Sequence, residues 1–191
     1  MRYAPEHNEE TRERILAAAS RLFQEHGIAA VGLAKIMTEA DLTVGTFYTH
    51  FESKEALLRE TLLRSLRARN EALAQALRAG DLEKAVRAYL SREHRDAPGA
   101  GCPAAALASE VARHPRATRQ TFATNLEPAL DILAELLSKR RGKKVGRAEA
   151  AAFFGLLVGT LQLARATPHR AESDAVLDAG VAAALRLASA R

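Results

Sequence analysis

Five hydrogen-bonding side chains lie between residues 43 and 50, namely those of Thr43, Thr46, Tyr48, Thr49 and His50. Hydroxyl groups and an imidazole nitrogen suit contacts with phosphate oxygens and with base edges in the major groove of DNA. Gly45 has no side chain, which permits close approach of a base or of the nucleic-acid backbone. Lys54 stands at the start of a predicted helix, where its ammonium and the free backbone N–H groups can hold a phosphate. The cluster predicts a surface that binds nucleic acid.

Residues 33–51 are predicted to form the helix-turn-helix that presents this cluster. A short helix over residues 33–40 has apolar side chains on one face, at Leu33, Ile36, Met37 and Ala40. A turn at residues 41–43 separates it from a second helix over residues 44–51. Phe47 and Phe51 are four residues apart, so both are expected to face inward and leave the polar side chains on the other faces.

Residues 36–58 resemble the TetR/AcrR family of bacterial transcriptional repressors. The agreement is specific at Gly45, Tyr48, His50, Phe51, Lys54 and Leu57. The resemblance implies phosphate contacts from Tyr48, His50 and Lys54. It also implies base-edge positions for Thr43, Val44, Gly45, Thr46 and Thr49. The alternative is structural, with Tyr48 packed as an ordinary aromatic residue and His50 capping the helix.

Two positions depart from the family pattern. The chain has Gly32 and Leu33 where the family usually has a Thr or Ser that opens the first of the two helices, so one phosphate contact is expected to be lost. Asp41 stands where the family has glycine in the turn. Aspartate tolerates left-handed backbone better than most residues, so the turn is expected to form.

The whole chain is predicted to be all-α. Its 191 residues are rich in Ala and Leu, which favour helices, and punctuation by Gly, Pro and capping residues divides them into nine helical segments. The family resemblance implies a nine-helix architecture in two parts. Residues 1–52 would be a DNA-binding domain of three helices, and residues 53–191 a ligand-binding and dimerisation domain. One of the nine helices is expected over residues 81–94 and the last over residues 173–191.

Charge and composition narrow the function classes. The chain has a formal net charge of +5, yet residues 1–60 contain seven Lys or Arg and ten Asp or Glu, so bulk charge does not reveal a DNA-binding end. No HExxH, CxxC, phosphate-binding loop or GxSxG motif occurs, so no catalytic residue, metal site or cofactor is predicted, and an enzyme is not expected. A single cysteine and no apolar run long enough to span a bilayer favour a cytoplasmic protein without a membrane partner.

A small-molecule effector is expected to bind between the helices of residues 53–166, as the resemblance implies. The candidate lining residues are Tyr89, Cys102, Leu107, Phe122, Leu126, Phe153 and Phe154. Few charges lie on the apolar faces, which favours a hydrophobic or aromatic effector. Each candidate is also compatible with ordinary core packing.

The last two helices are expected to form a homodimer interface. The candidate residues are Phe154, Gly155, Val158, Gly159, Leu177, Val181 and Ala184. Gly155 and Gly159 are four residues apart, so one helix face lacks side chains and lets another helix approach. The alternative is that these residues pack in the core of a single chain.

The sequence thus predicts a ligand-responsive homodimeric repressor that binds a palindromic operator in double-stranded DNA. An alternative makes Cys102 the input, because a thiol at a helix N-terminus is favoured as the reactive thiolate. In that case the repressor senses oxidants or electrophiles. Cys102 is equally compatible with a packing role, since a small thiol packs well in an Ala-rich helix.

Overall fold

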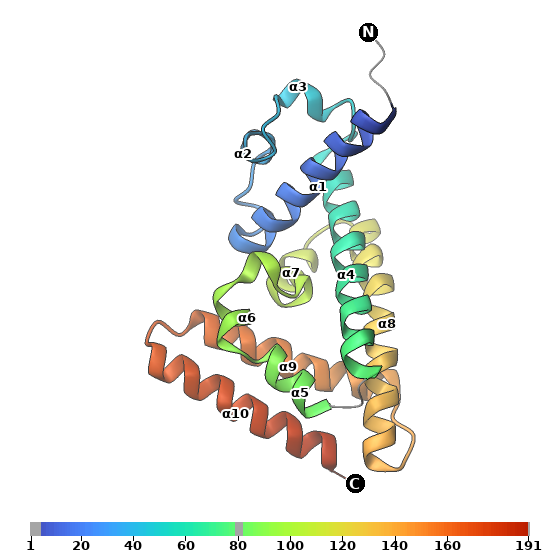
Figure 1. The fold of residues 1–191 in the computed structure, drawn as a ribbon, viewed down its shortest axis with the longest axis vertical. Helices are drawn as coiled ribbons and strands as arrows, with labels where there is room; N and C mark the ends of the chain where they lie inside the picture. The colour runs from blue at the N-terminus through green and yellow to red at the C-terminus, as the bar shows by residue number, and fades with distance from the viewer. Residues whose placement is uncertain (1–4, 79–81, 191) are drawn as a thin grey trace.

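The computed structural model describes residues 5–78 and 82–190, which form ten α-helices and one short 3-10 helix (Figure 1). The elements in chain order are α1 (Pro5–His26), α2 (Leu33–Glu39), α3 (Val44–Phe47), α4 (Lys54–Arg78), α5 (Leu82–Tyr89), α6 (Arg92–Asp96), η1 (Pro98–Ala100), α7 (Pro103–Val111), α8 (Arg116–Arg141), α9 (Arg147–Ala166) and α10 (Arg170–Ser189). No strand occurs in these two described ranges. The all-α prediction is confirmed.

The first three helices gather at one end of the molecule, around the upper part of α4 (Figure 1). They share a hydrophobic core with the first turns of α4 and with α7. Phe47 and Phe51 are both buried in this core, with stacked rings 5.6 Å apart, as their spacing predicts. Leu57 and Leu62 of α4 belong to the same core, so α4 is shared between the two parts of the fold. The boundary between residues 52 and 53 stays a prediction.

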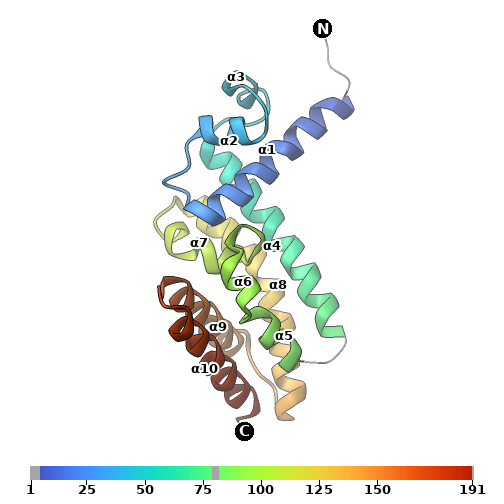
Figure 2. The ribbon, with the colours of Figure 1, turned by 60° about the vertical axis from the view of Figure 1, so that its left-hand side comes forward.

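The remaining helices form a second core. Helices α4 and α8 run side by side, and α9 packs lengthwise against α10 (Figures 1 and 2). The two last helices pack closely at Gly180, where a Cβ atom would lie 2.2 Å from Cγ2 of Thr160. Glycine is therefore required at this position by the distance between the helices.

Three local expectations differ from the structure. The helix expected over residues 81–94 is two helices, α5 and α6, from Leu82 onward; residue 81 lies outside the described residues. The helical conformation is interrupted before Ser91, whose hydroxyl accepts from the His94 N–H and caps α6. The helix expected over residues 44–51 ends at Phe47 and continues as turns. The last helix begins at Arg170 rather than near Ser173, which lies inside it and donates to the carbonyl of Ala164.

The turn between α2 and α3 confirms the expectation for Asp41. Its φ is 56°, in the left-handed region that glycine adopts most readily. The carboxylate of Asp41 lies 3.7 Å from the guanidinium of Arg14, which also donates to the carbonyl of Ala40. This contact ties the turn to α1 and fixes where α3 begins.

Candidate nucleic-acid interface and internal cavity

Helix α3 presents a polar surface to solvent at one end of the molecule. Tyr48 is 64% exposed and Val44 is 42% exposed, whereas Phe47 between them is fully buried. The hydroxyls of Thr43 and Thr46 lie 3.1 Å apart, within hydrogen-bond distance of each other on the exposed segment. The structure brings the predicted contact residues 43–49 onto one exposed segment.

Gly45 lies in the middle of this surface. A Cβ atom built there would meet only the Thr43 hydroxyl, at 3.8 Å, which is an ordinary contact. The fold of the free chain therefore does not require glycine at this position. The predicted benefit of having no side chain at Gly45 is therefore close approach of a DNA base or backbone from outside the chain.

His50 is half-buried below the exposed segment. Its backbone carbonyl accepts a hydrogen bond from the Arg12 guanidinium at 2.7 Å. Burial, together with the positive charge of Arg12, lowers the pKa of His50, so its imidazole is neutral near pH 7. A neutral ring contacts a phosphate by donating one hydrogen bond, without adding charge. Arg12 itself pairs with Glu60 and lies over the Phe51 ring at 4.3 Å.

Lys54 faces the interior in the free chain. Its Nζ donates to the carbonyl of Ile28 at 2.6 Å and lies 5.8 Å from the centre of the Phe23 ring. The hydroxyl of Ser53 accepts from the N–H of Ala56 and caps α4. The phosphate role of Lys54 stays a prediction, since it requires the ammonium to be shared with or released from Ile28.

A cavity of about 430 Å³ lies between α4, α5, α8 and α9, closed at one end by α6 and the start of α7. Five of the seven predicted lining residues border it, namely Tyr89, Cys102, Leu126, Phe153 and Phe154. Two predicted residues do not. Leu107 is buried in the core of the first three helices, and Phe122 packs between the two cores. The prediction for these two residues depends on the size of their side chains, and size does not indicate which side of a helix faces a cavity.

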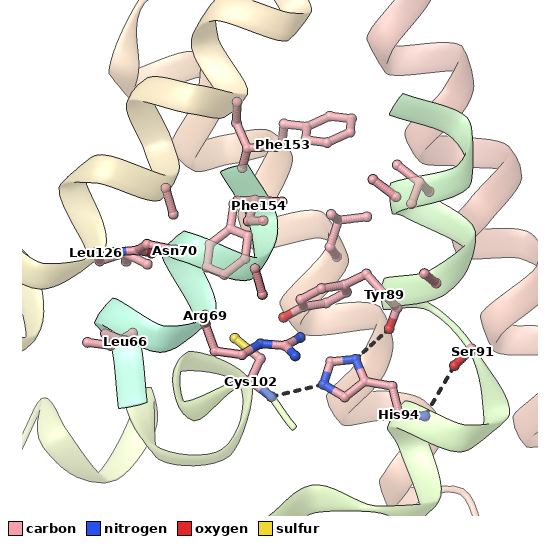
Figure 3. A pocket seen from close by; sticks show the side chains of 18 of the residues that line it. Leu66, Arg69, Asn70, Tyr89, Ser91, His94, Cys102, Leu126, Phe153 and Phe154 are labelled. Atoms are coloured by element: carbon pink, nitrogen blue, oxygen red, sulfur yellow. Dashed lines mark hydrogen bonds between the residues drawn. The ribbon is translucent and has the colours of Figure 1, made fainter. Parts of the chain in front are cut away.

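The sequence reasoning missed the polar residues of this cavity, which include Arg69, Asn70 and His94 (Figure 3). Nδ1 of His94 donates to the carbonyl of Tyr89 at 2.7 Å. Its Nε2 accepts from the backbone N–H of Cys102 at 2.9 Å. The ring therefore joins the end of α5 to the start of α7, and both of its nitrogens are engaged. No local spacing pattern signals these residues.

The chain is expected to lose stability in mild acid because of His94. Burial, aided by the charges of Arg69 and Arg165, lowers the pKa of His94. An unfolded histidine titrates near pH 6.5, so below that pH the unfolded chain binds the proton more readily than the folded chain. The stability that neutral His94 contributes is present above about pH 6.5 and is lost as the pH falls further. Thermal unfolding between about pH 7.5 and 5.5 measures the slope.

The matched variant for this test is His94→Gln. It is expected to flatten the fall of the melting temperature with acid, whatever its own stability at neutral pH. His50 shifts in the same direction, so part of the slope remains and His50→Gln serves as the comparison. An unchanged slope in His94→Gln would contradict the assignment.

Two elements connect the cavity to the first three helices. Helix α7 begins at the cavity, and near its other end the carboxylate of Glu110 accepts from the N–H groups of Ile28 and Ala29, at 2.9 and 3.1 Å. Helix α4 carries Arg69 at the cavity and Glu55 in its first turn, where Glu55 accepts from Thr118 of α8. Helices α4 and α7 therefore both contact the first three helices and border the cavity.

The predicted dimer-interface residues divide into two groups. Leu177, Val181 and Ala184 are buried in the core of the single chain, at 3%, 7% and 0% exposure. Their burial supports the alternative of packing in the core of the single chain, and their assignment to a dimer face stays a prediction. Gly155 and Gly159 are different, since a Cβ atom at either would meet nothing within 4 Å. Phe154 lines the cavity and Val158 is partly buried.

The sequence is similar to those of bacterial transcriptional regulators. Residues 15–61 match the family described as bacterial regulatory proteins, tetR family. The chain is 38% identical over 81 residues to the transcriptional regulator TtgR of Pseudomonas putida, a match that covers 42% of this chain and 38% of TtgR. It is 27% identical over 138 residues to the repressor NemR of Escherichia coli, covering 69% of each chain. It thus spans less than half of TtgR.

Solved structures show the same fold over nearly the whole chain. Reduced NemR of E. coli superposes with a TM-score of 0.76 at 23% identity, covering 93% of this chain and 96% of NemR. A TetR-family regulator from Streptomyces coelicolor superposes with a TM-score of 0.65 at 28% identity, covering 95% of this chain and 97% of that one. Among the described residues, no helix is long and apolar enough to cross a membrane. These relatives are named as transcriptional regulators, residues 15–61 belong to the tetR family of bacterial regulatory proteins, and the fold of nearly the whole chain is similar to that of a TetR-family regulator.

Proposed function

We propose that the protein is a homodimeric, ligand-responsive repressor that binds a palindromic operator in double-stranded DNA. The observation that carries the proposal is the exposed segment at α3. Val44 and Tyr48 are solvent-facing although both are large and apolar or aromatic, while Phe47 and Phe51 anchor the segment from below. A surface of this kind is stable in the free chain and complementary to a DNA groove. The protein would act in the cytoplasm.

The homodimer is supported by an unpartnered face of α9 and α10. Between residues 150 and 166 the exposed positions on α9 are small or apolar and include Ala152, Gly155 and Leu163, which is 64% exposed. On α10 they include Ala175, Ala179, Ala182 and Leu187. A second copy of the chain that presents the same face would bury this surface around a two-fold axis. Two α3 segments would then read two half-sites.

The cavity supports an effector role. Its walls include α4 and the start of α7, the same elements that touch the first three helices. A ligand that binds one arrangement of these helices better than the other would shift the population toward it. The spacing of the two α3 segments would then cease to match the operator.

Selection of bound duplexes from a random DNA library tests the function directly, at about 150 mM salt because phosphate contacts weaken steeply as salt rises. The expected result is a palindrome whose half-sites are about one helical turn apart, roughly 34–36 Å. Recovery of no consensus by the full chain in reduced and in oxidised form would overturn the proposal.

A second candidate function uses Cys102 as the sensor. Its thiol lies in the wall of the cavity, next to Tyr89 and Arg69 (Figure 3). An electrophile that enters the cavity would therefore meet the thiol directly. Cys102→Ser is expected to abolish release of DNA by a thiol-reactive compound while DNA affinity is unchanged. Release that persists in Cys102→Ser would exclude this function.

A further inference from the structure

Arg69 stands out among the residues of the cavity. It projects from α4 toward Cys102, His94 and Tyr89, between otherwise apolar walls (Figure 3). The residue is half-buried, and its guanidinium has no hydrogen-bond or ion-pair partner in the part of the chain that the structure describes. By contrast, the nearby Arg165 donates to the backbone carbonyls of His94 and Arg95. A cation placed among apolar side chains without a counter-charge is unfavourable unless an anion joins it.

The cavity itself does not supply that anion. Of the lining residues that the structure describes, only Glu93 carries a carboxylate, and its side chain is exposed. A hydrogen bond from its own backbone N–H, followed by one with Ser91, lowers the pKa of Glu93 and holds the carboxylate at the first turn of α6. Glu93 therefore remains at that turn and does not form an ion pair with Arg69.

Tyr89 adds a second unused donor. Its hydroxyl oxygen is buried, has no nitrogen or oxygen partner within the described chain, and lies beside the Cys102 thiol. Burial, together with the neighbouring Cys102, raises the pKa of Tyr89 far above its ordinary range, so the hydroxyl keeps its proton and can donate.

The other polar groups of the cavity are already engaged. Both ring nitrogens of His94 bond to backbone groups, and the amide nitrogen of Asn70 donates to the carbonyl of Asn125 at 2.8 Å. The polar end of the cavity thus offers one guanidinium and one phenol, both as donors. The rest of the wall is apolar and aromatic, contributed by Leu66, Leu126, Leu133, Phe153, Phe154 and Leu157.

We propose that the cavity binds a hydrophobic monocarboxylic acid, whose carboxylate accepts hydrogen bonds from the Arg69 guanidinium and the Tyr89 hydroxyl. This inference rests on the proposed function, in which the cavity holds the effector. A single carboxylate matches the planar fork of arginine and the single positive charge available. The apolar part of the acid lies between Phe153, Phe154 and Leu126. A volume of about 430 Å³ accommodates a small aryl or medium-chain alkyl acid.

The test compares acids with their neutral amides on the full-length protein. The probes are 1-naphthylacetate, 4-phenylbutyrate and the alkanoates from hexanoate to dodecanoate, each beside its amide, with binding measured by calorimetry. At least one acid is expected to bind about tenfold or more tightly than its amide, since a hydrogen bond to a charged group is worth at least that much. If no acid exceeds its amide by this factor, the proposal is wrong.

Variants assign the effect to the polar end of the cavity. Arg69→Met is expected to weaken the acid about tenfold or more and leave the amide unchanged, and Tyr89→Phe to weaken the acid by a smaller factor. Arg67→Met is the matched control, because Arg67 is exposed on the same helix and does not line the cavity. Equal binding of the acid by Arg69→Met and by the unaltered protein would overturn the assignment.

Release from the selected operator separates this inference from the proposed function. An acid that binds through Arg69 and releases DNA supports both. An acid that binds through Arg69 without affecting DNA supports the ligand class and contradicts the effector role. Amides that bind as well as the acids and release DNA support the effector role and overturn the ligand class.

Discussion

Gly159→Arg is expected to convert the protein into a folded monomer that binds its operator about 100-fold more weakly or worse. A Cβ atom at Gly159 meets nothing within 4 Å in the single chain, so we expect the fold to accommodate the arginine. In the proposed dimer the same position lies between two closely packed helices, where a long charged side chain prevents their approach. Loss of the second half-site then removes the gain from simultaneous binding. Sedimentation and operator titration measure the two effects.

Ala123→Arg is the matched control for this prediction. Ala123 is exposed and lies on α8, a different helix from the two that form the proposed interface. It is expected to remain dimeric and to bind the operator normally. A Gly159→Arg protein that stays dimeric would place the interface on another surface.

Gly45→Leu is expected to lower operator affinity by about tenfold to a hundredfold, with the melting temperature of the free protein nearly unchanged. The free chain has room for the side chain, because the nearest atom to a Cβ there is the Thr43 hydroxyl at 3.8 Å. In the complex the leucine would stand between α3 and the base edges, at a cost of about 1–3 kcal/mol per lost base contact. Fluorescence anisotropy with the selected operator measures the affinity.

The control for Gly45→Leu is Gly146→Leu. Gly146 precedes α9, and a Cβ atom there also meets nothing within 4 Å. Its substitution is expected to leave operator affinity unchanged. If Gly45→Leu bound the operator as well as the unaltered protein, α3 would not approach the bases at this residue.

The helix-turn-helix was predictable because its determinants are local. Phe47 and Phe51 pack one turn apart, so their spacing alone predicts which face is buried, and the structure confirms it. Asp41 occupies the turn, and aspartate is a residue type that tolerates left-handed backbone. Its φ of 56° agrees with that expectation. The exposed contact residues follow once these buried ones are known.

The cavity was predictable only in part. The bulk of apolar side chains predicts Phe153 and Leu126 as lining residues, and both border the cavity. Bulk predicts Leu107 equally, yet Leu107 lies in the core of the first three helices. Periodicity tells that a helix has an apolar face. It does not tell whether that face meets a neighbouring helix or an open space, because this depends on where the other helices lie.

The sequence by itself determined the helical fold class and the helix-turn-helix at residues 33–51, since both depend on contacts between residues a few positions apart. The tertiary structure alone decided the rest. It placed Arg69, Tyr89 and His94 from three different helices around one cavity, and it directed the Lys54 ammonium to a carbonyl 26 residues away. It also turned Leu177 of α10 inward. The physical reason is that burial and pairing of a side chain depend on helix packing between distant segments, which leaves no spacing pattern in the chain.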